Sequence, residues 1–182
     1  MKTIFKYLLY FIFFIITLFL FLPKENIYYA ILETLQKNKI VLSHSTLSDD
    51  YFSLDIKNIK TKYDDIEVSN NANFHLDMFL YKTNINIYDI NIDQSFSKYI
   101  PTKIKNININ HTIIDPLYIN IDFDFGKYKA IGQVNLLKRV VKIDFNVDKL
   151  FKVKYKYIAK QLKQIKNNSD KKQEVYSFEY KY

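Results

Sequence analysis

The segment Pro116–Leu136, PLYINIDFDFGKYKAIGQVNL, decides the fold. Apolar side chains take every second position before Gly126, and they do so again after Lys127. The two series are Leu117, Ile119, Ile121, Phe123 and Phe125, then Tyr128, Ala130, Val134 and Leu136. Two alternating runs around a turn that contains glycine predict a β-hairpin with one apolar face. Gly132 takes an apolar position in the second run, where it would allow a bend or a close approach.

The same alternation continues on both sides of this hairpin, from Ile40 to Val147. Asn70 and Asn71 interrupt it and suggest a bulge. At Tyr88 and Asp89 the phase slips by one residue, which would reverse the faces unless a bulge or turn lies there. The pattern predicts a mainly β fold with some α-helix, built on a curved antiparallel meander of groove, half-barrel or jellyroll type. The aromatic C-terminus, EVYSFEYKY, is expected to pair with this sheet as a strand.

Two amphipathic helices are predicted beside the strands. The first follows Pro23, in KENIYYAILETLQKN, and its apolar stripe would either rest on a bilayer surface or cap the domain. The second is a late amphipathic helix over residues 149–166, with Asp148 as its N-cap and apolar residues at 4-3-4-3 spacing.

A run of 16 residues without charge, Tyr7–Leu22, predicts an N-terminal transmembrane helix. Lys2 and Lys6 precede it, which favours a cytoplasmic N-terminus, and no small residues suit a signal-peptide cleavage site after it. We therefore expect an uncleaved signal anchor over residues 1–22 and a periplasmic β-rich domain over residues 23–182. The anchor positions chosen to represent this helix are Tyr7, Phe11, Phe14, Leu18 and Leu22.

Several chemistries lack a sequence signature. The net charge is +8, but Arg139 is the only arginine among 27 basic residues, which argues against nucleic acid as a partner. The chain has no cysteine, and its three histidines stand in different segments, so no metal site is predicted. With two glycines it offers no phosphate loop or nucleophile elbow. We expect neither an enzyme nor a cofactor.

The order of elements resembles the protein N component of type II secretion systems and the wider AsmA-like envelope proteins. The resemblance rests on the apolar run ending at Leu22-Pro23, the next helix, the strand Phe52–Ile59, the hairpin arm with Ala130-Ile131-Gly132, the late helix and the aromatic end Tyr176–Tyr180. It implies a bitopic protein of the bacterial inner membrane whose curved periplasmic sheet has a hydrophobic concave side associated with lipid handling or envelope assembly. The LPS-export protein C, with one anchor and a β-jellyroll, is an alternative that would lack the late helix.

The expected function is that of an accessory protein in envelope assembly, secretion or lipid handling. The expected partners are the membrane, crossed once, lipid acyl chains and other envelope or secretion-complex proteins. A purely structural subunit, with the apolar faces closed into a core, remains the alternative. The residues predicted to face lipid are Phe74, Leu76, Met78, Ile119, Ile121, Phe123, Val134, Ile143 and Phe145.

Overall fold

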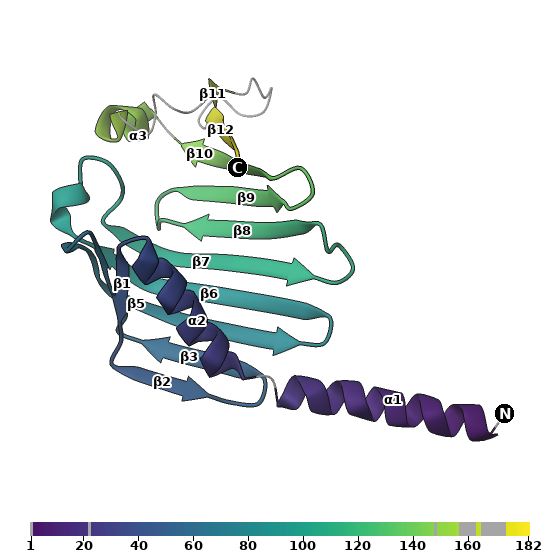
Figure 1. Ribbon diagram of the computed structural model, residues 1–182. Helices are drawn as coiled ribbons and strands as arrows, with labels where there is room; N and C mark the ends of the chain where they lie inside the picture. Colours follow the sequence, from purple (N-terminus) through teal and green to yellow (C-terminus); the bar gives the residue numbers. More distant parts are fainter. Residues whose placement is uncertain (1, 22, 148, 157–162, 165–173) are drawn as a thin grey trace.

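Twelve strands form a single antiparallel sheet in the computed structural model, which describes all residues except 1, 22, 148, 157–162 and 165–173. Figure 1 shows helix α2 lying across one face of the sheet, whereas α1 leads away from its side. The helices are α1 (Lys2–Leu20), α2 (Lys24–Lys37) and α3 (Lys149–Lys154), with a short 3-10 turn at Gln94–Phe96.

The strands follow one another across the sheet with few exceptions. The first six are β1 (Ile40–Ser43), β2 (Thr46–Asp49), β3 (Ser53–Lys57), β4 (Lys60–Tyr63), β5 (Ile66–Phe79) and β6 (Lys82–Ile92). The others are β7 (Lys103–Thr112), β8 (Tyr118–Asp124), β9 (Lys129–Asn135), β10 (Val140–Val147), β11 (Lys163–Gln164) and β12 (Glu174–Lys181). The spatial order is β1-β4-β5-β6-β7-β8-β9-β10-β12-β11. The predicted antiparallel meander is therefore present from β5 to β10.

Strand β5 is where the sheet branches. Its first residues pair with β4, and its second half, from Phe74 to Asp77, pairs with β3. Strand β2 then pairs with the outer side of β3. The 14-residue length of β5 allows it to pair with both β4 and β3, and strand β1 lies beside helix α2 (Figure 1).

Both predicted irregularities are bulges. The register between β5 and β6 shifts on either side of Asn71, and Asp89 has a positive φ of 54°. In the β6–β7 ladder, Tyr88 and Ile90 have partners and Asp89 between them has none. Because the bulge absorbs one residue, Ile87 and Ile90 pack against the same buried cluster despite their odd spacing.

The hairpin predicted around Gly126 is formed by β8 and β9. Gly126 has a φ of +80°, and its N–H donates to the Asp124 carboxylate at 2.7 Å. Gly132 lies opposite Ile121, and its lack of a side chain permits the close approach that the sequence suggested.

The C-terminal strand is confirmed, because β12 pairs with β10 along its whole length. The late helix is shorter than predicted. Helix α3 covers Lys149–Lys154, and Lys163 and Gln164, which the prediction placed in this helix, form strand β11 against β12. At these two residues, backbone pairing with β12 overrides the helix favoured by the 4-3-4-3 spacing of the apolar side chains. Parts of the predicted helix, residues 157–162 and 165–166, lie outside the described residues.

The predicted transmembrane helix is wrong. Within the part of the chain that the structure describes, no helix is both long enough and apolar enough to cross a membrane. Helix α1 ends at Leu20 rather than Leu22, and Lys6 interrupts its apolar sequence. The remaining uncharged stretch, Tyr7–Leu20, rises by about 21 Å, whereas a hydrocarbon core is about 30 Å thick.

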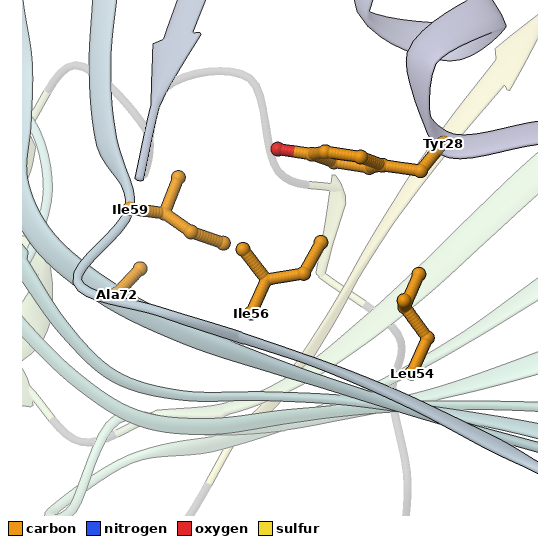
Figure 2. Packing of buried hydrophobic residues seen from close by; sticks show 5 residues of the cluster. All are labelled: Tyr28, Leu54, Ile56, Ile59 and Ala72. Atoms are coloured by element: carbon orange, nitrogen blue, oxygen red, sulfur yellow. The ribbon is translucent and has the colours of Figure 1, made fainter. Parts of the chain in front are cut away.

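The main core lies between α2 and the branched end of the sheet. Figure 2 shows the ring of Tyr28, from α2, above Ile56 and close to Leu54, with Ile59 and Ala72 beside them. Leu54 and Ile56 are almost fully buried, and Leu32 of α2 packs against the same cluster. Helix α2 therefore caps the domain, which was one of the two readings of its apolar stripe.

An ion pair fixes the start of α2. Lys24 is 4% exposed, and its Nζ lies 2.9 Å from the Asp49 carboxylate at the end of β2. The same ammonium donates to the Tyr51 carbonyl oxygen at 3.3 Å. These two contacts hold the junction of α1 and α2 at the β2–β3 turn.

Candidate functional site

The candidate site is the face of the sheet on which α2 and α3 lie, called here the apolar face. Antiparallel register aligns its side chains in three rows that cross neighbouring strands. The central row is Leu54, Leu76, Ile85, Ile109, Ile121, Gly132, Ile143 and Phe178. The second row is Ile56, Phe74, Ile87, Ile107, Phe123, Ala130, Phe145 and Tyr176. The third is Met78, Thr83, His111, Ile119, Val134, Val141 and Tyr180.

Helices cover the two ends of the apolar face and leave its middle open among the described residues. At one end, Tyr28 of α2 packs over β3 and β5. At the other end, Phe151 and Tyr155 of α3 bury Tyr176 and pack against Tyr128 and Phe145. Between these clusters the side chains of β7 and β8, such as Ile109 and Ile121, are only half-buried. A row of large aliphatic groups in this state is typical of a surface that binds another apolar molecule.

A cavity of about 620 Å³ lies at the α3 end of the apolar face. Its apolar lining includes Phe125, Tyr128, Leu150 and Val153. The ring of Phe125 stacks on that of Phe123, with centroids 6.1 Å apart, so the cavity continues the second row.

The same cavity carries a cluster of positive charge. Lys103, Lys127 and Lys154 line it, and none of its described lining residues is acidic. Lys154 Nζ lies 5.4 Å from the centroid of the Tyr155 ring, and Lys127 Nζ lies 5.2 Å from that of Tyr128. Lysine side chains beside an aromatic and aliphatic wall can attract an anion and accommodate an apolar chain at the same place.

The opposite face of the sheet is polar, because asparagines alternate with the isoleucines. Asn84, Asn110 and Asn120 lie in register across β6, β7 and β8. Farther along this face, His75 lies between two carboxylates. Its Nδ1 is 2.7 Å from Asp55 and its Nε2 is 3.1 Å from Asp77.

The hydrogen bond to Asp55 raises the pKa of His75 above its ordinary value, and the charges of Asp55 and Asp77 add to the rise against the effect of burial. This cluster was not predicted from the sequence, in which the three histidines stand in different segments. The spacing of His75 and Asp77 on one face of a strand was visible, but the third member, Asp55, comes from β3. In the described part of the chain, no three histidine or acidic residues are arranged to hold a metal ion.

All nine residues predicted to face lipid lie in the three rows of the apolar face, so the structure brings them together. That lipid is what they contact stays a prediction. The prediction omitted Ile85, Ile107 and Ile109, which occupy the middle of the face and share the alternation that identified their neighbours. It also missed the three lysines of the cavity, whose proximity depends on the α3 fold.

The residues chosen to represent the membrane anchor do not join this site. Tyr7, Phe11, Phe14 and Leu18 lie on α1 and are exposed, each by at least half of its surface. Leu22 lies outside the described residues.

Comparison of the chain with protein-family models, with curated proteins and with solved structures gave no match. The resemblance to protein N of type II secretion systems and to AsmA-like proteins therefore stays a prediction.

Proposed function

We propose that the protein binds an anionic amphiphile, with the acyl chain against the apolar face and the acidic head group beside Lys103, Lys127 and Lys154. One observation carries the proposal: the in-register apolar rows continue, through the stacked rings of Phe123 and Phe125, into a cavity lined by those lysines. An apolar surface next to a concentrated positive charge fits a fatty acid or an anionic phospholipid.

The dimensions of the apolar face support a chain-like ligand. Strands β5 to β10 are six neighbours, and at about 4.8 Å per step the rows extend roughly 24 Å. The central half-buried section lies between the two helix-covered clusters, so a bound chain would follow the rows from one helix toward the other. Each methylene that leaves water there contributes about 0.8 kcal/mol.

Lipid handling in the bacterial envelope is the cellular role that this binding would serve. The predicted periplasmic location and the predicted envelope or secretion partners belong to this proposal and stay predictions. The binding chemistry does not depend on them.

The test uses the full chain and two fluorescent probes, a C16 fatty acid and the corresponding fatty alcohol. The double variant Lys103→Glu/Lys127→Glu changes two exposed side chains of the cavity. We expect it to weaken binding of the acid about tenfold or more and to leave binding of the alcohol nearly unchanged. The matched control is Lys129→Glu, whose exposed side chain alternates with the buried Ala130 and so lies on the polar face.

A second variant tests the apolar face itself. Phe123→Glu should abolish binding of both probes, and Ile131→Glu, an exposed position on the polar face, should not. Circular dichroism of each variant shows whether the sheet is retained. If the wild-type chain binds neither probe, and a photo-crosslinker at position 121 captures only its own chain, the apolar face is a closed core and the structural-subunit alternative replaces this proposal.

A further inference from the structure

Four turns on one edge of the sheet form a continuous row, called here the tip row. They are residues 50–52, 80–81, 113–117 and 136–139, which connect β2–β3, β5–β6, β7–β8 and β9–β10, together with Phe79 at the end of β5. In Figure 1 these turns follow one another along the right-hand side of the sheet.

Direct contacts join each turn to the next. Phe52 stacks on Phe79, with ring centroids 5.8 Å apart and planes 16° from parallel. The Ile113 N–H donates to the Tyr81 carbonyl oxygen at 3.0 Å. The Leu136 N–H donates to the Leu117 carbonyl oxygen at 2.9 Å. The four turns are therefore one surface rather than separate loops.

The tip row is apolar and exposed, which is unusual for turns. Ile114 is 86% exposed, Leu137 74% and Tyr51 72%, and every one of the four turns contributes such a residue. At the opposite edge, Asp64-Asp65 and Gly126-Lys127 form the tips of the β4–β5 and β8–β9 turns, and the β6–β7 connection, residues 93–102, exposes Tyr99 by 48% but keeps Phe96 and Ile100 half-buried. Turns usually consist of small and polar residues. The exposed aliphatic and aromatic side chains of the tip row therefore need another explanation.

The shape and charge of the tip row favour a lipid surface over a protein partner. The row runs from β2 to β10, roughly 34 Å at 4.8 Å per strand, but it is only one turn deep. A long, narrow row of exposed apolar tips suits insertion among lipid head groups better than the broad patch that protein interfaces bury. Lys138 and Arg139 lie in the tips and Lys82 lies beside them, whereas Asp50 and Asp115 lie in the same turns and the neighbouring Asp49 is paired with Lys24. The small positive excess favours anionic head groups.

Helix α1 provides independent support for the same class of partner. The Lys24 contacts hold the junction between α1 and α2 at the β2–β3 turn, which belongs to the tip row. The apolar helix α1, whose side chains are largely exposed, therefore leaves the sheet at this edge (Figure 1).

We propose that the tip row is a membrane-contact edge, which places Tyr51, Phe79, Ile114 and Leu137 in the interface of an anionic bilayer with the sheet standing on that edge. The tip row shares no residue with the three rows of the apolar face or with the lysine cavity, so a membrane-contact edge is independent of the function proposed above.

The chain has no cysteine, so single cysteines can carry an environment-sensitive fluorophore in the full-length protein. The test positions are Ile114→Cys and Leu137→Cys. The controls are Ile66→Cys, 59% exposed in β5 where it follows the Asp64-Asp65 turn, and Ile131→Cys, 60% exposed on the polar face. Vesicles of phosphatidylcholine, with and without phosphatidylglycerol, are added to each labelled protein. We expect a blue shift and quenching by spin-labelled lipid at positions 114 and 137, stronger with phosphatidylglycerol, and neither at positions 66 and 131.

A second experiment separates the tips from α1, which every variant retains. Ile114→Glu/Leu137→Glu should lower vesicle partitioning about tenfold, whereas Ile66→Glu/Ile131→Glu should leave it unchanged. All four side chains are exposed, so these changes spare the core. The proposal is overturned if positions 114 and 137 stay in water while the protein is bound, if position 66 responds equally, or if both double variants partition like the wild type.

Discussion

Gly132 and Ile121 approach each other so closely that a Cβ atom on Gly132 would lie 3.3 Å from the Cβ of Ile121. The same atom would lie 3.3 Å from Cε2 of Phe123. Val at this position needs two further methyl groups in the middle of the apolar face, so Gly132→Val should destabilise the fold by about 1–3 kcal/mol. Urea unfolding followed by circular dichroism measures the change. Ile131→Val, on the exposed neighbour, should stay within about 0.5 kcal/mol of the wild type.

The two faces of β8 can be distinguished with one added charge. Ile121→Asp places a carboxylate among aliphatic groups and should cost about 2–3 kcal/mol, through lost burial and a poorly hydrated charge. Asn120→Asp lies on the exposed face and retains the oxygen that accepts from Gln133 Nε2 at 3.1 Å, so it should cost less than about 0.5 kcal/mol. Equal unfolding midpoints for the two variants would show that the assigned faces are wrong.

His75 should make stability depend on pH. Its pKa is raised in the folded protein, chiefly by the hydrogen bond to Asp55, so the folded state binds the imidazole proton more tightly than the unfolded state does. The resulting stabilisation is fully present below the unfolded-state value of about 6.5 and is lost as pH rises through the higher folded-state value. Besides Asp55 of β3 and Asp77 of its own strand, His75 faces only the neutral Asn86 of β6 in the ladder.

The stability advantage of the wild type over His75→Asn should therefore be larger at about pH 5 than at about pH 9. An NMR titration of the His75 ring provides a direct reading, and Asp55→Asn should move its midpoint downward. A midpoint that does not move in Asp55→Asn would contradict the assigned cause.

The Lys24–Asp49 ion pair should respond asymmetrically to mutation. Asp49→Asn leaves the ammonium of Lys24, 4% exposed, without its carboxylate and should cost about 2–3 kcal/mol. Lys24→Met should cost less, because Asp49 is 28% exposed and water can solvate it. The exposed Lys37–Glu33 pair is the control, and Lys37→Met should change the unfolding free energy by less than about 0.5 kcal/mol. Equal costs for the three variants would contradict the role given to burial.

The alternation of apolar and polar residues was sufficient to predict the meander from β5 to β10, the β8–β9 hairpin and the two bulges. A period of two is a local property, and the slip at Asp89 appears directly as a change of parity. Alternation also identified the apolar face, because antiparallel pairing of consecutive strands necessarily aligns residues such as Ile109 and Ile121.

Features that depend on partners far along the chain were not predictable in this way. The Asp55–His75 contact depends on the register between β3 and β5, and the strand at Lys163–Gln164 depends on β12 being alongside. The lysine cavity requires the placement of α3 against Tyr128. The transmembrane helix was predicted from the uncharged run Tyr7–Leu22. Helix α1 ends at Leu20, and it is not long and apolar enough to cross a membrane.

The branched, consecutive order of strands also affects how the chain folds. From β5 to β10 every strand pairs with the one made just before it, so each step closes only a short loop and the sheet can grow strand by strand during synthesis. Strand β10 is the exception on its outer side, since its second partner, β12, emerges only after residues 148–173 have been made. Until then the backbone of Val140–Val147 presents free donors and acceptors, and two partly synthesised chains could pair through them. The aromatic C-terminus thus protects the growing edge of the sheet against self-association.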